Sequence, residues 1–196
     1  MFQIRIHGRG GQGVVTAAEV LSMAAFAQGR TAQAFPSFGS ERMGAPVVSF
    51  CRIDDHPIRT REPVMEPDAL IIQDATLIHQ VDLFAGLRRE AYVIINTSRT
   101  LAQLGLGEFS GQLDPDRLLT CPATEFALEQ LGRPLPNAAL IAGFAALTGE
   151  ISLDAIDTAI RQRFGGPVGE RNVAAATAAY RFVADARAES AHVAAD

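Results

Sequence analysis

A glycine-rich stretch near the start of the chain has the residue types and spacing of a phosphate-binding turn. Gly8, Gly10 and Gly13 fit the pattern G-x-G-x-x-G within residues 6–15, which read IHGRGGQGVV. In such a turn one glycine permits a tight bend, one lets a phosphate approach the backbone, and one lets a helix pack on a strand. The free N–H groups at the start of the following helix, together with the helix dipole, favour an anion at this place.

Three uses of this turn remain open from the spacing alone. An NAD or FAD site requires an acidic residue about 20 positions further on, at the end of the second strand, where it holds the ribose. Residues 28–35 read QGRTAQAF, and from there the first acidic residue is Glu41. The alternatives are a different phosphate ligand, and a turn that lets the first helix pack closely or fit against another subunit.

Few other residues have the types and spacing that catalysis needs. Arg42 lies beside Glu41 in a loop rich in glycine and proline, where it is either a clamp for a phosphate or carboxylate or one half of a surface ion pair. The four histidines lack metal-ligand spacing, and no serine stands in a G-x-S-x-G setting. Asn137 precedes a helical pattern and is interpreted as its N-cap. The chain thus has a ligand-type loop but no catalytic group or metal site of its own.

Composition and charge narrow the class of protein. The 196 residues suit one domain with a real core, and 48% of them are hydrophobic. A net charge of -5 and the absence of tryptophan argue against nucleic-acid binding. No apolar run reaches the roughly 20 residues that cross a bilayer, and the N-terminus enters a strand pattern in place of a signal peptide. We expect a cytoplasmic protein that binds neither nucleic acid nor membrane.

The two cysteines, Cys51 and Cys121, are far apart in sequence and form no C-x-x-C motif. We therefore expect this chain to hold no iron–sulfur cluster alone, and both thiols to be buried, reduced and structural.

Hydrophobic periodicity predicts alternating strands and helices. Helices are expected at residues 14–28, 75–89, 123–131, 137–148, 153–164 (with Ser152 as N-cap) and 173–188. Strands are expected at residues 1–7, 31–35, 47–53, 69–73, 91–96 and 118–121, with a turn at 54–57 that leads into a short hairpin at 58–59. This order predicts an α/β fold: a single-domain, three-layer, Rossmann-like, mostly parallel sheet with helices on both faces. The domain is expected to cover residues 1–190, followed by a frayed C-terminal tail at 191–196.

The glycine motif also begins a longer resemblance. Residues 8–13, GRGGQG, resemble the opening motif of the gamma subunit of the 2-oxoacid:acceptor oxidoreductases, the pyruvate/ketoisovalerate:ferredoxin oxidoreductase family. The likeness continues through residues 35–46 (FPSFGSERMGAP), 67–70 (PDAL), 122–127 (PATEFA), 137–149 and 170–173 (ERNV). It covers nearly the whole chain, and the pairing of GxGGQG with PSFGxERxGAP is specific.

The resemblance implies the chemistry of the whole enzyme. Such enzymes cleave a 2-oxoacid with thiamine diphosphate, release CO2, pass electrons through [4Fe-4S] clusters to ferredoxin or another acceptor, and transfer the acyl group to coenzyme A. Thiamine diphosphate and the clusters belong to partners, which are thiamine-binding alpha and beta type subunits and a ferredoxin-like subunit. The resemblance implies that the gamma subunit packs against the thiamine-bearing subunits and contributes to coenzyme A access.

The resemblance also suggests which residues of this chain meet a ligand. Coenzyme A is expected at the glycine loop, with contacts from Gly8, Gly10, Gly11, Gln12, Gly13 and Arg42. Two alternatives remain. One is a stand-alone dinucleotide-binding Rossmann protein, which the missing acidic residue disfavours, and the other is a structural interaction subunit whose loop only packs against a neighbour.

Overall fold

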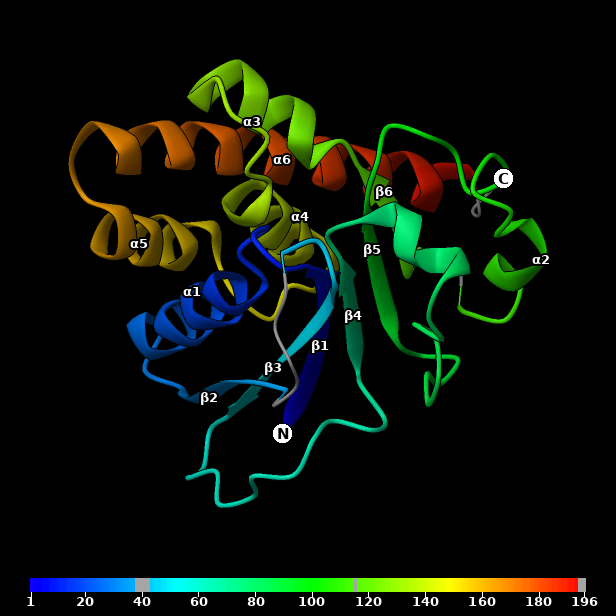
Figure 1. Ribbon diagram of the computed structural model, residues 1–196, viewed down its shortest axis with the longest axis horizontal. Coiled ribbons are helices and arrows are strands. Elements are labelled where there is room, and N and C mark those ends of the chain that lie inside the picture. The colour runs from blue at the N-terminus through cyan, green and yellow to red at the C-terminus, as the bar shows by residue number, and fades with distance from the viewer. Residues whose placement is uncertain (38–42, 115, 194–196) are drawn as a thin grey trace.

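The computed structural model describes residues 1–37, 43–114 and 116–193, and it contains one six-stranded sheet (Figure 1). Across the sheet the strands follow the order β2-β3-β1-β4-β5-β6. Their bounds are β1 (Phe2–Arg9), β2 (Thr31–Pro36), β3 (Pro46–Asp54), β4 (Ala69–Ile72), β5 (Tyr92–Asn96) and β6 (Leu118–Cys121).

Four strands form the parallel half of the sheet and two form an antiparallel edge. β1 pairs in parallel with β4, β4 with β5, and β5 with β6, whereas β3 runs antiparallel to both β1 and β2. The parallel strands β4 and β5 carry runs of apolar residues, ALII and YVIIN, because both faces of a parallel sheet are covered. All four strands of the parallel half end at the same edge of the sheet, which is where ligands bind in α/β folds.

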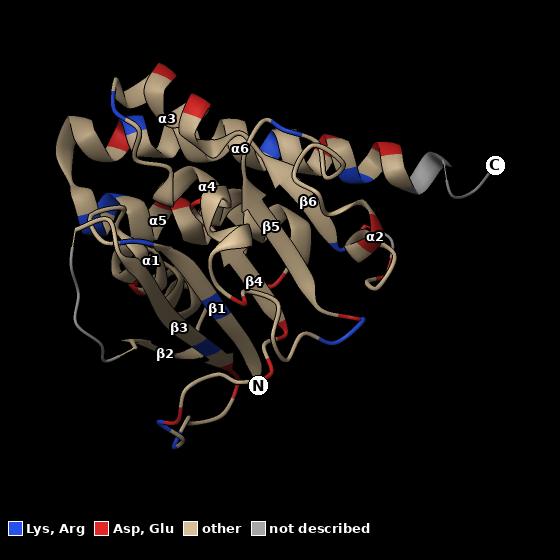
Figure 2. Cartoon of the chain, turned by 45° about the vertical axis from the view of Figure 1, so that its right-hand side comes forward, with Lys and Arg blue, Asp and Glu red and all other residues tan. Residues whose placement is uncertain are grey.

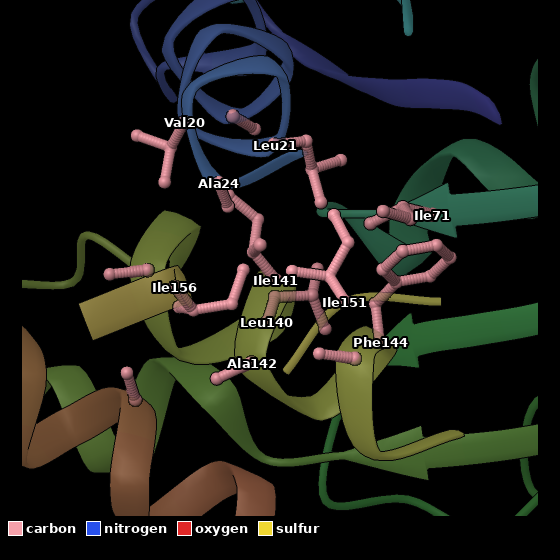
Figure 3. Close-up of a cluster of buried hydrophobic side chains, with 14 of the residues drawn as sticks. Val20, Leu21, Ala24, Ile71, Leu140, Ile141, Ala142, Phe144, Ile151 and Ile156 are labelled. Carbon is pink, nitrogen blue, oxygen red and sulfur yellow. The ribbon is translucent and has the colours of Figure 1, made fainter. Parts of the chain in front are cut away.

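Helices α1, α4 and α6 contact one face of the sheet, with α4 at the centre, and α3 and α5 pack against these helices (Figure 1). Every residue of α4 from Ala138 to Leu147 is buried, as expected for a helix that is apolar all round. Figure 3 shows side chains of α1, α4 and α5 meeting between the helices and the sheet, among them Leu21, Ile141 and Ile156. The bounds are α1 (Val14–Ala27), α3 (Ala123–Leu131), α4 (Asn137–Thr148), α5 (Leu153–Phe164) and α6 (Gly166–Val193).

The opposite face of the parallel half is covered by shorter pieces of chain. A 3-10 helix, η1 (Ala75–His79), and a single-turn helix, α2 (Gly107–Ser110), pack there with the loops around them. Leu77, Leu83 and Leu104 enter this second core from those segments and meet the outward face of β4 and β5. The predicted α/β class, with a mostly parallel sheet and helices on its two faces, is confirmed.

Strands β1 and β3 carry two buried arginines on the face of the sheet opposite to the helix layer. Figure 2 shows basic residues on β1 and β3 within the sheet; Arg5 on β1 is 7% exposed and Arg52 on β3 is 2% exposed. Arg5 donates to the carbonyl oxygens of Leu83 and Ala85 at 2.8 and 2.7 Å, and Arg52 donates to the carbonyl of Glu62. These guanidinium groups hold the long loops against the sheet by donating to loop carbonyl groups, and Arg52 also donates to the side-chain oxygens of Gln3 and Gln33 at 3.1 and 3.4 Å.

Arg5 also explains why one predicted helix is wrong. The apolar spacing in residues 75–89 predicts a helix, but the regular turn ends at His79. Beyond it, the carbonyl groups of Leu83 and Ala85 point at Arg5 instead of into a helix, and Gly86 adopts a positive φ of 74°. A long-range hydrogen-bond donor therefore overrides local periodicity at this place.

The remaining elements match the sequence prediction closely, with local exceptions. All six strands form where predicted, and Ser152 caps α5 by accepting from the backbone N–H of Ala155. α6 starts at Gly166, seven residues before the predicted 173, and extends through Val193. Residues 55–68 run as a loop in place of the predicted hairpin at 58–59, and α2 was not predicted. Within the described ranges, no helix is long and apolar enough to cross a membrane.

Candidate functional site

The glycine loop connects the end of β1 to the start of α1, at the carboxyl-terminal edge of the parallel strands. β1 ends at Arg9, and Gly13 is the N-cap of α1 in the left-handed conformation, with φ 72° and ψ 36°. The predicted position of the loop, between a strand and a helix N-terminus, is therefore correct. Gly11 also has a positive φ of 90°, so two of the four glycines adopt a conformation that other residues rarely take.

The two sequence motifs that carry the family resemblance are in contact. The backbone N–H of Gly10 donates to the carbonyl of Ala45 at 2.9 Å, and the N–H of Gly44 donates to the carbonyl of Gly10 at 3.1 Å. Gly10 and Met43 also form an isolated β-bridge. Residues 43–45 thus continue the edge of the sheet beside the glycine loop, whereas Arg42 lies outside the described residues.

Arg9 fixes the outer side of the loop. Its Nε donates to Oδ2 of Asp74 at 3.1 Å, and its two terminal nitrogens donate to the side chains of Thr76 and Gln80 and to the carbonyl of Gly44. Because four groups accept from this guanidinium, Arg9 joins the loop to η1 and to Gly44, in the segment that leads into β3. We interpret Arg9 as a residue that shapes the loop.

Gln12 and Asp74 complete this network. The backbone N–H of Arg9 donates to Oε1 of Gln12 at 2.7 Å, and Nε2 of Gln12 donates to Oδ2 of Asp74 at 2.8 Å. Burial acts to raise the pKa of Asp74, but hydrogen bonds from Thr76 and Gln12 and the charge of Arg9 outweigh it, so the pKa lies below its ordinary value. Asp74 is therefore ionised at neutral pH and balances the charge of Arg9.

Two glycines are required by close packing against side-chain amides. A Cβ on Gly8 would lie 2.7 Å from Cγ2 of Val14 and 3.1 Å from Oε1 of Gln73, and a Cβ on Gly13 would collide with Nδ2 of Asn137. The interpretation of Asn137 as a helix cap is wrong. The N-cap of α4 is Pro136, and the Asn137 amide instead lies against the turn that starts α1.

A cavity of about 630 Å³ opens beside the loop at the ends of the parallel strands. This volume is in the range of small-molecule sites. Its walls come from the ends of β4 and β5, from η1, and from the starts of α1 and α3. The lining residues are Gln12, Gln73, Asp74, Ala75, Thr76, His79, Gln80, Asn96, Thr97, Arg99, Leu104 and Thr124.

Residues that the sequence argument missed organise this cavity. Asn96, at the end of β5, accepts from the backbone N–H of Thr124 at 3.0 Å and donates through Nδ2 to the carbonyl of Gln73 at 2.8 Å. It thereby ties the ends of two strands to the start of α3. The sequence does carry a signal for these two residues: Gln73 directly follows one buried parallel strand and Asn96 ends the next, and the carboxyl ends of parallel strands meet at the ligand-binding edge of the sheet.

Three further titratable groups on the strands, His7, Cys51 and Cys121, are largely shielded from water. Burial, with a contribution from the charge of Arg5, lowers the pKa of His7 to about 4, so its imidazole is neutral at pH 7. Cys51 and Cys121 are free and buried as predicted, and burial raises the pKa of each thiol to about 12. Within the part of the chain that the structure describes, no three metal-ligating side chains lie close enough together to hold a metal ion.

The strand order argues against a dinucleotide site of the Rossmann type. In that site the second strand lies beside the first and carries the acidic residue that holds the ribose. Here the neighbours of β1 are β3 and β4, while β2 lies at the far edge of the sheet beyond β3. The topology and the missing acidic residue therefore both disfavour a dinucleotide site of the Rossmann type.

Comparison with known proteins identifies the family. The sequence matches the family described as "Pyruvate ferredoxin/flavodoxin oxidoreductase" over residues 3–182. It is 45% identical over 183 residues to pyruvate synthase subunit PorC of Methanothermobacter thermautotrophicus, covering 93% of this chain and 96% of that protein. It is 44% identical over 180 residues to the common subunit gamma of the pyruvate/ketoisovalerate oxidoreductases of Pyrococcus abyssi, covering 92% and 96% of the two chains.

A solved structure supports the same assignment. The crystal structure of the pyruvate oxidoreductase subunit PORC of Thermotoga maritima superposes with a TM-score of 0.79 at 31% identity, and the match covers 92% of this chain and 95% of that one. The chain therefore belongs to the pyruvate ferredoxin/flavodoxin oxidoreductase family, as a gamma-type subunit of a 2-oxoacid:ferredoxin oxidoreductase.

Proposed function

We propose that this chain is the gamma subunit of an enzyme that uses thiamine diphosphate and [4Fe-4S] clusters, and that it contributes to subunit assembly and to coenzyme A access. The enzyme converts a 2-oxoacid, coenzyme A and an oxidised acceptor into acyl-CoA, CO2 and the reduced acceptor. Thiamine diphosphate is held by alpha and beta type partners, and the clusters by a ferredoxin-like partner. We place the assembly in the cytoplasm, and we assign residues 1–190 to one gamma-type domain.

The observation that carries the coenzyme A part of this proposal is the position of the glycine loop. It lies at the carboxyl-terminal edge of the parallel strands, directly before the N-terminus of α1 and beside the 630 Å³ cavity. The first turn of α1 contains no acidic residue, so the positive end of its dipole is available to a phosphate. We propose that the loop Gly8–Gly13 and Arg42 face coenzyme A at this edge.

The shape of the loop supports this role. The bonds of Arg9, Gln12 and Asp74 fix the loop from one side, and Gly44 and Ala45 fix it from the other. A loop that is already ordered loses little conformational entropy when a ligand arrives. The same bonds occupy the amide of Gly10 and the guanidinium of Arg9. We propose Arg42 as a cation for the phosphate.

The experiment is a titration of coenzyme A in the assembled enzyme carrying Arg42→Ala, with dye reduction as the readout. Arg59→Ala is the matched control, because Arg59 is an exposed arginine in the 55–68 loop. We expect a rise of about tenfold or more in the apparent KM for coenzyme A, as for the loss of a charge-assisted contact. KM for the 2-oxoacid and the subunit content should be unchanged.

Two results bear against parts of this proposal. An unchanged requirement for coenzyme A in the Arg42 variant would exclude Arg42 from the site. Loss of partner subunits without any change in coenzyme A dependence would assign the loop region to assembly alone.

A further inference from the structure

A second pocket lies within the helix layer, where α3 ends, α4 begins, and α5 leads into α6 (Figure 1). Its volume is about 340 Å³, and it shares no lining residue with the cavity at the ends of the parallel strands. It joins two of the segments that carry the family resemblance, residues 137–149 and 170–173. The proposed coenzyme A contacts use neither of these segments.

The charged residues that line this pocket are both arginines. Arg133 and Arg171 are exposed, and neither forms an ion pair within the described part of the chain. The neighbour of Arg171 in sequence, Glu170, is occupied elsewhere, because its two carboxylate oxygens accept from Arg161 at 2.7 and 3.1 Å. The pocket therefore presents two guanidinium groups whose charge the chain does not neutralise.

Two helix dipoles add to this positive charge. α4 and α6 both begin at the pocket, and neither has an acidic residue in its first turn. The positive ends of the two dipoles therefore point toward the same place as the two guanidinium groups. Since the whole chain has a net charge of -5, the pocket is a local basic site on an acidic protein.

The remaining wall of the pocket is mostly apolar. Phe164 lines it from the end of α5, while Leu135 and Val168 also line it and are 40% and 54% exposed. Exposed apolar side chains around a pocket are typical of a site for a protein partner, because an apolar anchor that fills the pocket removes them from water.

Asn172 supplies one directional group to the pocket. Its side chain is 6% exposed, and Nδ2 donates to the carbonyl of Val168 at 2.9 Å. Within the described residues its Oδ1 accepts no hydrogen bond, and this oxygen is not sealed from solvent. Asn172 can therefore accept a hydrogen bond from one N–H group that enters the pocket.

We propose that this pocket is a docking site for a partner subunit, and that the docked segment carries a large apolar side chain beside an acidic one. The apolar side chain packs against Phe164, and the carboxylate pairs with Arg133 and Arg171. A backbone N–H of the same segment donates to Asn172. The inference rests on the assembly role in the proposed function, and it assigns that role to a defined surface.

The charges favour a different subunit over a second copy of this chain. In a twofold dimer formed through this surface, the pocket of one copy would face the pocket of the other. Arg133 and Arg171 would then meet the same two arginines, and like charges placed opposite each other disfavour association. An acidic segment of another subunit has the complementary charge.

The first test identifies the segment that occupies the pocket. The photo-crosslinking amino acid p-benzoylphenylalanine replaces Leu135 in the tagged chain of the assembled enzyme, and mass spectrometry maps the adduct. The control places the same amino acid at Met65, which is 73% exposed in the 55–68 loop. We expect the Leu135 position to label one segment of a partner subunit, with an aspartate or glutamate next to an apolar residue, and the Met65 position not to label it.

The second test reverses one charge. We expect Arg171→Glu to raise the dissociation constant of this chain for the labelled subunit by about tenfold or more, with partial recovery when the acidic residue of that segment is changed to lysine. Arg181→Glu is the matched control, because Arg181 is also exposed on α6 but does not line the pocket. The Tm of the free Arg171→Glu chain should be unchanged or slightly raised, since an exposed glutamate near a helix N-terminus is tolerated.

Three results would overturn the inference while the proposed function still stood. They are an intact, active assembly in which the Leu135 position labels only a second copy of this chain or nothing, equal dissociation constants for Arg171→Glu and Arg181→Glu, and a raised KM for coenzyme A in Arg171→Glu with all subunits retained. The last result would make the pocket a ligand site. A wild-type chain that retains no partner subunit would refute the proposed assembly role and this inference together.

Discussion

Arg9 and Asp74 lie 65 residues apart in the sequence, yet Nε of Arg9 donates to Oδ2 of Asp74 at 3.1 Å. This ion pair joins the end of β1 to the residue that caps η1, and both side chains are largely shielded from water. It converts a flexible glycine-rich turn into a loop with one shape, and it connects the glycine motif to the wall of the cavity.

Removing the guanidinium of Arg9 should destabilise the chain. In Arg9→Met, Asp74 keeps the hydrogen bonds from Gln12 and Thr76 but loses its compensating charge. We expect a loss of roughly 2 kcal/mol in the free energy of unfolding, as for a partly buried charge left without its partner. Urea unfolding of the free chain gives the value.

The control for this measurement is Arg88→Met. Arg88 pairs with Glu66 at the surface, where both side chains are more than half exposed, and such pairs contribute little to stability. Equal losses in the two variants would contradict the structural role given to Arg9.

The contact between Gly13 and Asn137 should appear as coupling between two substitutions. Gly13→Ala adds both left-handed strain and a collision with the amide of Asn137, whereas Gly132→Ala adds the strain alone, because the space around Gly132 is open. We expect about 1 kcal/mol of destabilisation for Gly132→Ala and clearly more for Gly13→Ala.

Adding Asn137→Ala to Gly13→Ala should recover part of the additional loss in the free energy of unfolding, since the double substitution removes the collision. A double-mutant cycle by urea unfolding measures this coupling. Additive effects of the two substitutions would show that the loop and α4 are not in contact.

His7 should make stability depend on pH in the acidic range. Its pKa in the folded chain is about 4, below its ordinary value of 6.5, so the unfolded chain takes up the proton first as pH falls. The free energy of unfolding should therefore decrease below about pH 6.5, by roughly 3 kcal/mol in total when pH 4 is reached.

The comparison that isolates this effect is between the wild type and His7→Leu from pH 7 to pH 4. Carboxylates titrate in both chains, so the difference between the two curves of unfolding free energy against pH is due to His7. Parallel curves would show that His7 is protonated as easily in the folded chain as in the unfolded one.

The two thiols should resist modification in the folded chain. Burial raises the pKa of Cys51 and Cys121 to about 12, so their thiolate forms are scarce at pH 8. We expect labelling by a thiol reagent to be at least about a hundredfold slower in buffer than in denaturant. Rapid labelling of either residue in buffer would mean that the sheet opens readily.

Local sequence signals predicted most of the fold. The apolar runs at β4 and β5, the alternation in β1 and the glycine spacing before α1 each depend on neighbours within a few residues, and all of them appear in the structure. The helix expected at residues 75–89 stops at His79, because beyond it the carbonyl groups of Leu83 and Ala85 bond to Arg5, which is 78 to 80 residues away.

The candidate site was only partly predictable for the same reason. The loop itself is a local feature, but the roles of Arg9, Gln73 and Asn137 arise from contacts that cross the sheet or join separate helices. Neither the residue types nor the neighbouring sequence distinguishes these positions from others in the chain. The contact between the glycine loop and residues 43–45 likewise required the β3 strand to be placed beside β1.

The central claim is that this gamma-type chain works inside a thiamine- and cluster-dependent enzyme that consumes coenzyme A. The most direct measurement is anaerobic purification of the tagged chain from its native cells, followed by assay of coenzyme A-dependent reduction of a viologen dye with a panel of 2-oxoacids that includes pyruvate. We expect thiamine-bearing and cluster-bearing partners to co-purify, with turnover that requires coenzyme A. A chain that purifies alone and inactive, or an assembly whose turnover is independent of coenzyme A, would contradict the claim.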